Sequence, residues 1–235
     1  SGILCLLGVL PWLHTRVALP AAVLTTLVVW RLWTGPGFAA RRRDHVVAFL
    51  TPIAVLLVAW SAYSKAIFGS WNPTMAYGGA PLDFRRLPGG LLGLMVDQEF
   101  GLVANAPIHL LWIPSLVLLW RRHPRLGREW FATIAPYVLA IGAFGFWWAG
   151  ASAPARFLVP VAFPMGVALA ALWAWSRAST RAVCLTLLVG SGLIAAALAC
   201  GGGGHLAYND AHGHARWLMW VSPLLDLTKA WPSAF

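Results

Sequence analysis

Charged residues are scarce in this sequence: they make up 10% of its 235 residues, and only 7 residues are acidic. A typical soluble domain is about 25% charged, so this chain has too little charge to cover a water-soluble globule. Hydrophobic residues make up 60% of it, and its mean hydropathy is +0.72. The composition excludes an ordinary soluble protein and indicates a polytopic membrane protein.

Cysteine and catalytic signatures are also sparse. The three cysteines are Cys5, Cys184 and Cys200, and the first two fall inside apolar runs. An odd number in such positions favours buried free thiols over a disulfide framework. The sequence contains no CxxC pair, no HExxH, no Walker-type loop and no recognisable Ser/His/Asp set. Hydrolases and nucleotide-driven enzymes therefore lose support.

The net charge of +10 raises the question of nucleic-acid binding. The arginines lie at the ends of apolar segments rather than along one stripe. That distribution is typical of membrane orientation and not of a nucleic-acid surface. We therefore expect no nucleic-acid partner.

Long apolar runs are abundant. They predict an all-α fold, a polytopic helical bundle in the membrane with about six transmembrane helices and interfacial helices in the outer loops. Residues 1–200 would form this bundle, with an outer loop at residues 69–107, and residues 201–235 would form an extracytoplasmic tail. The predicted spans are residues 17–33, 45–68, 108–120, 129–148, 157–175 and 182–200.

The chain begins inside an apolar run. Residues 3–10 are interpreted as the end of a helix that starts upstream, and Pro11 is expected to begin a polar interfacial turn. We therefore expect that further protein precedes Ser1.

Basic residues also predict the orientation. If the loops alternate, ten arginines and two acids share one side of the membrane, and seven basic and five acidic residues share the other. The positive-inside rule assigns the first side to the cytoplasm. The 69–107 loop and the C-terminus would then lie outside the cytoplasm.

The 69–107 segment, rich in glycine and proline, holds the first candidate site. Irregular backbone cannot face lipid, because each unpaired polar group costs several kcal/mol, so this segment must lie at the water interface or in a protein-lined cavity. Within it stand Asp97, Gln98 and Glu99. Two carboxylates against apolar surface could act as acid, base or cation ligands. The alternative is an interfacial turn whose acids face water.

Two further sets of basic residues suit a phosphate. Arg156 could make a bidentate contact to a lipid phosphate, or serve as a headgroup anchor. His14 and Arg16, two residues apart, suit a phosphate or pyrophosphate leaving group, or an ordinary interfacial turn.

A histidine cluster near the C-terminus contains metal-ligand types. His205, His212, His214 and Asp210 occur in HLAYNDAHGH. Zinc accepts such ligands, but the spacing matches no established motif. The sequence therefore predicts no metal site, and whether a divalent cation is needed stays open.

Several stretches resemble the C-terminal half of the GT-C superfamily of polyprenyl-phosphate-dependent glycosyltransferases, in the branch similar to bacterial protein mannosyltransferases and aminoarabinose transferases. They are distributed in order over nearly the whole chain. The stretches are LLGVLPWLHTRVAL, IFGSWNPTMAYGG, GLMVDQEFGLVANAPIHLLWIPSL, FWWAGASAPARFLVPVAFP and SPLLDLTKAWPSAF.

The resemblance implies an enzyme that transfers a sugar from a polyprenyl-phosphate carrier to an acceptor outside the cytoplasmic membrane. It implies that Arg156, helped by His14 and Arg16, binds the lipid phosphate. Tyr77 and the Asp97–Gln98–Glu99 turn would shape the outer vestibule or the acceptor site. The family's main catalytic acid lies in an outer loop near the N-terminus, which would precede Ser1, so the isolated chain is expected to be inactive.

Two other interpretations remain. A transporter or flippase-like protein needs ionisable groups near the membrane midplane, whereas the mid-span positions here are almost entirely apolar. A noncatalytic membrane scaffold is the third class.

Overall fold

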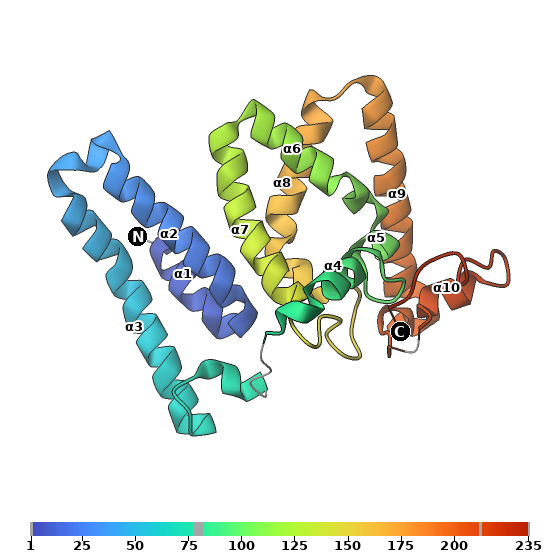
Figure 1. Ribbon diagram of the computed structural model, residues 1–235, viewed down its shortest axis with the longest axis horizontal. Coiled ribbons are helices and arrows are strands. Elements are labelled where there is room, and N and C mark those ends of the chain that lie inside the picture. The colour runs from blue at the N-terminus through green and yellow to red at the C-terminus, as the bar shows by residue number, and fades with distance from the viewer. Residues whose placement is uncertain (1, 78–81, 212, 235) are drawn as a thin grey trace. The chain divides into compact units, whose positions relative to one another are not determined.

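The computed structural model describes residues 2–77, 82–211 and 213–234, and it is helical (Figure 1). Within these ranges no β-strand occurs, and the β-contacts are the isolated bridges Leu82–Phe144 and Ser152–Asn209. The all-α prediction is therefore confirmed for the described part of the chain. The chain divides into two compact units, residues 1–81 and 82–235, and each is described by itself.

The first unit consists of three helices that contact one another pairwise. They are α1 (Gly2–Leu13), α2 (Ala18–Thr34) and α3 (Arg42–Phe68), with the 3₁₀ turns η1 (Thr15–Val17), η2 (Pro36–Arg41) and η3 (Pro73–Tyr77). The expectation that Pro11 begins a turn was wrong, because α1 continues through it to Leu13. Gly8 permits the close approach of α1 to α3, since a Cβ there would overlap Leu56.

The second unit contains the remaining helices. The helices α4 (Leu87–Val96), α5 (Leu102–Asn105) and α6 (Trp112–Arg122) lead to α7 (Pro124–Gly142), α8 (Val159–Trp175), α9 (Ala178–Cys200) and α10 (Arg216–Val221). The 3₁₀ turns are η4 (Phe84–Arg86), η5 (Pro107–Leu111), η6 (Arg156–Leu158) and η7 (Gly201–Ala207). The 69–107 loop is thus partly helical, since α4 and α5 and the 3₁₀ turns η3 and η4 lie within it.

Four helical segments are long and apolar enough to cross a membrane: residues 15–34, 36–68, 156–175 and 178–207. In three of them, only 6–11% of the most apolar window is buried inside the structure, so their apolar side chains face outward. A water-soluble protein would not tolerate so much exposed apolar surface. These helices indicate an integral membrane protein.

Two of the six predicted spans differ from the helices observed. α6 has 11 residues, because the turn η5 takes up the beginning of the apolar run. α7 begins at Pro124 directly after His123, so arginines expected in a loop occupy its first turns, and it ends at Gly142 rather than at residue 148. Six spans therefore remain a prediction.

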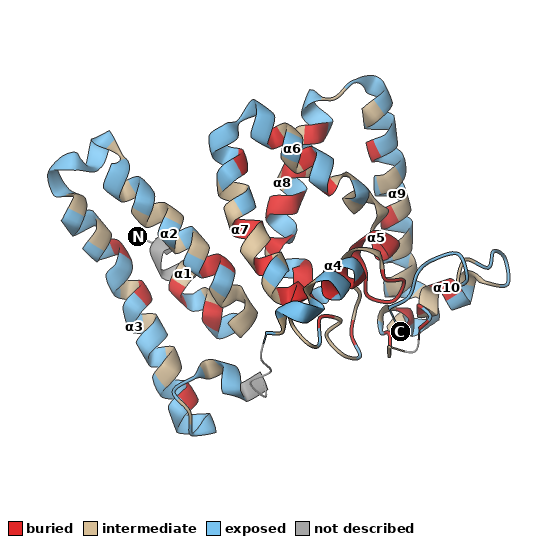
Figure 2. Ribbon diagram, viewed as in Figure 1, coloured by how far each residue is buried: buried red, intermediate tan, exposed pale blue. Residues whose placement is uncertain are grey.

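The core of the second unit lies where α4, α5, α7 and α8 meet, as the concentration of buried residues in Figure 2 shows. Tyr137 of α7 is almost fully buried, and its hydroxyl donates a 2.5 Å hydrogen bond to the Phe157 carbonyl oxygen. Leu94 of α4 and Met165 of α8 are equally buried. This core supports the turns at one end of these helices, where Asp97, Gln98, Glu99 and Arg156 lie.

Candidate functional site

The Asp97–Gln98–Glu99 turn connects α4 to α5. The Asp97 Oδ1 atom accepts hydrogen bonds from the backbone N–H groups of Glu99 (2.9 Å) and Phe100 (2.7 Å). The Gly101 N–H donates to the Asp97 carbonyl oxygen at 2.8 Å. A Cβ at Gly101 would overlap backbone atoms of Asp97, so the turn requires glycine there. The aspartate thus organises its own turn, as side chains of this type commonly do.

The same three side chains are 1% exposed, and they bind the C-terminal tail. Asp97 Oδ2 accepts from the Ala234 N–H at 2.8 Å, and Glu99 Oε2 accepts from the Gly213 N–H at 2.9 Å. The Gln98 side chain donates to the Trp231 carbonyl oxygen at 3.2 Å and accepts from the Ala215 N–H at 3.4 Å. Hydrogen bonds from backbone N–H groups are what a buried carboxylate needs to offset its lost hydration.

Two asparagines complete this network. Asn209 donates to the Glu99 carbonyl oxygen at 2.5 Å, and its own oxygen accepts from the Arg216 N–H at 3.1 Å. Asn105 donates to the Gly101 carbonyl oxygen at 2.9 Å and accepts from the Trp217 indole N–H at 3.0 Å. Both asparagines were missed in the sequence analysis. Asn209 pairs with Glu99 and Asn105 with Trp217, each more than a hundred residues away, and no sequence motif marks their nearer partners.

The acidic turn therefore anchors the tail, which Figure 1 shows folded beside α5. This arrangement differs from a turn whose acids face water, because the carboxylate oxygens are occupied by the protein's own backbone. A role in shaping a vestibule is compatible with it. Tyr77 was predicted to shape the same vestibule. It lies at the end of η3 in the first unit, and its side chain falls outside the described residues.

The tail turn that faces Gln98 is itself held by an acid. Asp226 Oδ1 accepts from the Thr228 N–H at 3.1 Å and from its hydroxyl at 2.6 Å. These two hydrogen bonds hold the pKa of Asp226 below its usual range, and the bond from the Thr228 hydroxyl has the larger effect. The turn presents the Thr228 carbonyl oxygen, which accepts from the Gln98 side chain at 3.4 Å.

Arg156 is exposed at the start of η6. Its Nη2 donates to the Ala149 carbonyl oxygen at 2.9 Å, and its guanidinium carbon lies 5.9 Å from the centre of the Phe157 ring. Ala149 and Ala155 both have positive φ values, 73° and 50°, so the preceding turn is tightly bent. The Ala155 N–H donates to the Phe100 carbonyl oxygen at 3.0 Å, which ties the arginine's turn to the acidic turn.

A pocket of about 400 Å³ is lined by Ala155, the residue before Arg156, while Arg156 itself is not part of the lining. Its wall includes Ala153, Pro154 and Ala155 together with small and apolar residues of α8 and α9. His109 also lines it, and the Nδ1 atom of that residue is buried without a hydrogen-bond partner among the described residues. The pocket can therefore take a slender apolar group, and Ala155 of its wall directly precedes Arg156 in the chain.

His14 and Arg16 lie in the first unit. His14 caps the turn η1, since its Nδ1 accepts from the Arg16 N–H at 3.2 Å, and both side chains are half-buried. This geometry matches an ordinary interfacial turn. Arg156 belongs to the other unit, so joint phosphate binding by the three residues stays a prediction.

The histidine cluster is not brought together as a metal centre. Asp210 pairs with Arg216 instead, and His212 lies outside the described residues. Within the described ranges, no group of three or more His, Cys, Asp or Glu side chains could hold a metal ion.

The chain was compared with models of protein families, with curated proteins and with solved structures, and none of them matches it. The functional interpretation therefore rests on the residues themselves and on the geometry of the second unit.

Proposed function

We propose that the chain is the C-terminal half of a GT-C type glycosyltransferase, which moves a sugar from a polyprenyl-phosphate carrier to an acceptor on the outer side of a bacterial cytoplasmic membrane. The observation that carries the proposal is Arg156, an exposed arginine that directly follows Ala153, Pro154 and Ala155 in the wall of an apolar pocket. The family resemblance of the surrounding sequence supports it. The main carboxylate would be contributed from upstream of Ser1.

Arg156 is suited to a phosphate because only part of its hydrogen-bonding capacity is used. Arginine carries five N–H donors in a rigid fork, and one hydrogen bond, to Ala149, positions the group here. Contact with Phe157 restrains it further. A restrained guanidinium with free donors loses little conformational entropy when it forms a bidentate contact to a phosphate.

The pocket suits the carrier's hydrocarbon. Its alanines, such as Ala162 of α8 and Ala195 and Ala199 of α9, leave room for a narrow chain between the two helices. An isoprenoid lying there would bring its phosphate toward the turn at residues 153–156. One pocket and one cation thus match the two chemical parts of the proposed carrier.

The proposed reaction is an inverting displacement. The acceptor oxygen, deprotonated by the upstream carboxylate, forms a bond to the anomeric carbon while the bond from that carbon to the phosphate oxygen breaks. The electron pair of the broken bond leaves with the lipid phosphate, where Arg156 stabilises the charge. Asp97, Gln98 and Glu99 serve as positioning residues, because they hold the tail and the arginine's turn.

The proposed topology keeps six spans. α6 together with η5, and α7, would add two spans to the four apolar segments, and the C-terminus would lie outside the cytoplasm. The excess of arginines at the helix ends around residues 121–128 and 177–181 supports this orientation.

Replacing Arg156 in the full-length enzyme tests the proposal. Arg156→Ala should lower sugar transfer from a radiolabelled polyprenyl-phosphate sugar by about a hundredfold or more, as the loss of a group that stabilises transition-state charge does. Membrane insertion should be unchanged. Arg177→Ala, at an exposed arginine in another turn, is the matched control and should transfer normally. Near-normal transfer by Arg156→Ala would refute the assignment.

One observation favours a transporter or flippase as the second candidate. The irregular backbone of η5 lies beside the middle of α9, where the Ile108 N–H donates to the Ser191 hydroxyl at 3.0 Å. Carriers commonly have interrupted helices at this depth. Uptake by proteoliposomes, without sugar transfer, would favour this candidate, and inactivity in both assays would favour a scaffold.

A further inference from the structure

The helices α6 and α7 enclose an apolar groove of about 640 Å³ in the second unit. Its surface is formed by side chains such as Ile113 and Val117 of α6 and Phe131 and Ala135 of α7. Ile113 is 62% exposed and Phe131 48% exposed, although both line the groove. An open apolar surface of this kind marks a binding site for an apolar partner.

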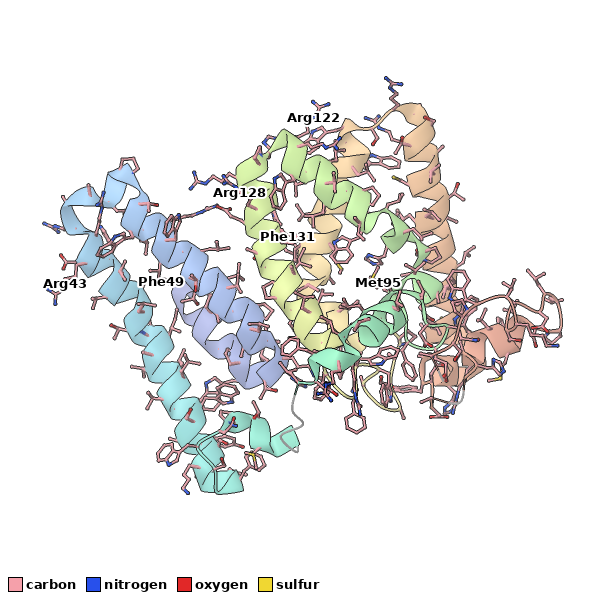
Figure 3. The ribbon with its side chains drawn as sticks, in the orientation of Figure 1. Arg43, Phe49, Met95, Arg122, Arg128 and Phe131 are labelled. Atoms are coloured by element: carbon pink, nitrogen blue, oxygen red, sulfur yellow. The ribbon has the colours of Figure 1, made fainter. Side chains whose placement is uncertain are left out.

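One end of the groove is strongly basic. Arg121 belongs to its lining, Arg122 is the last residue of α6, and Arg125 and Arg128 lie in the first turns of α7. Figure 3 shows Arg122 and Arg128 at this end and Phe131 farther along α7.

These four arginines differ in whether they have a partner within the protein. Arg125 lies 3.5 Å from Glu129, and Arg128 donates to the Pro124 carbonyl oxygen at 3.2 Å. Arg121 and Arg122 are exposed and form no hydrogen bond or ion pair with any described residue. The groove therefore ends at free guanidinium groups that can bind an anion.

The length of the groove matches one leaflet of a bilayer. Its lining runs from Arg121 back to Trp112 and from Phe131 on to Leu139, about 12–14 Å along each helix at 1.5 Å per residue. One leaflet of the hydrocarbon core is about 15 Å deep, half of the usual thickness.

We propose that this groove binds an anionic phospholipid, with an acyl chain against α6 and α7 and the phosphate on Arg121 and Arg122. Charge decides between this occupant and a second copy of the chain. Two copies in one membrane share their orientation, so their arginine-rich turns would meet at the same depth and repel each other. An anionic headgroup instead neutralises that end. This site is separate from the proposed sugar transfer and does not depend on it.

Native mass spectrometry of the full chain in detergent tests the site with two probes, phosphatidylglycerol and phosphatidylcholine of identical acyl chains. Phosphatidylglycerol should bind more tightly. The variant R121Q/R122Q should weaken its binding roughly thirtyfold, because each basic residue near an anionic headgroup contributes about 1 kcal/mol and the combined loss of about 2 kcal/mol corresponds to that change in Kd. R41Q/R43Q removes the same charge elsewhere and should bind normally.

A second pair of variants tests the hydrocarbon part. Ala135→Phe fills the groove and should lower phosphatidylglycerol binding, whereas Ala182→Phe, at an exposed position of α9, should not. Equal binding of the two lipids, or equal loss in R121Q/R122Q and R41Q/R43Q, would refute the proposal. So would a chain dimer that Ala135→Phe dissociates without changing lipid binding, because the groove would then be a self-interface.

Discussion

The first unit and the tail-binding region of the second unit satisfy their polar groups in different ways. In α2 and α3, the hydroxyls of Thr26 and Thr51 donate to carbonyl oxygens four residues earlier in the same helix. In the second unit, Asp97 receives a hydrogen bond from a residue 137 positions away, and Glu99 receives one from a residue 114 positions away. The first arrangement needs only a helix, whereas the second needs a complete tertiary fold.

The two regions also differ in what surrounds them. Only 11% of the apolar window of α2 or of α3 is buried inside the structure, so the stability of these helices depends on lipid around them. The acidic turn is buried by protein. We therefore expect substitutions in the two regions to differ sharply in cost.

Asp97→Ala should have the largest effect. It leaves the N–H groups of Glu99, Phe100 and Ala234 without their acceptor, and each unsatisfied buried donor costs about 1–3 kcal/mol. We expect a loss of at least about 3 kcal/mol, measured by unfolding in mixed micelles titrated with a denaturing detergent, together with faster proteolysis of the tail. Thr51→Ala in α3 is the control and should stay within about 0.5 kcal/mol. Equal losses in both variants would contradict the comparison.

Gly101→Ala should follow. The added Cβ would overlap the backbone of Asp97, and overpacking of this kind costs about 1–3 kcal/mol. Gly190→Ala in α9 is the matched control, because nothing lies within 4 Å of the new Cβ and alanine favours a helix by up to about 1 kcal/mol. The same unfolding titration should thus give opposite signs for the two variants. A neutral Gly101→Ala would show that the turn can relax.

Tyr137→Phe should have the smallest effect of the three. It removes the hydrogen bond to the Phe157 carbonyl oxygen but keeps the buried ring, so a loss of about 1–2 kcal/mol is expected. Tyr63→Phe, at a residue that is 52% exposed, should change the unfolding free energy by less than about 0.5 kcal/mol. If both variants behaved alike, the hydroxyl at Tyr137 would not stabilise the turn η6, which begins at Arg156.

Much of the fold could be predicted because hydropathy is local. The apolar runs at residues 17–33, 45–68, 157–175 and 182–200 coincide with α2, α3, α8 and α9, since a helix pairs its own backbone groups wherever the side chains tolerate lipid. Pro11 misled the prediction, because a proline in the interior of α1 is tolerated there. The run at residues 108–120 also misled it, because Pro107 begins a 3₁₀ turn before α6.

The candidate site was less predictable. The sequence drew attention to Arg156 and to the acidic turn, because charged residues beside apolar runs are unusual. It gave no indication that Asn105 and Asn209 complete the network, or that the tail supplies the donors. Side-chain amides and backbone N–H groups occur everywhere in a sequence, so no local pattern distinguishes the ones that will pair.

Taken alone, the sequence determined the class of this protein: an all-helical chain with long apolar segments, sparse charge and basic turns, because helix formation and transfer into lipid depend on neighbouring residues. Only the tertiary structure decided the role of the Asp97–Gln98–Glu99 turn, the pocket beside Arg156 and the groove ending at Arg121. These features depend on contacts between distant segments, and such contacts form only when the helices pack together.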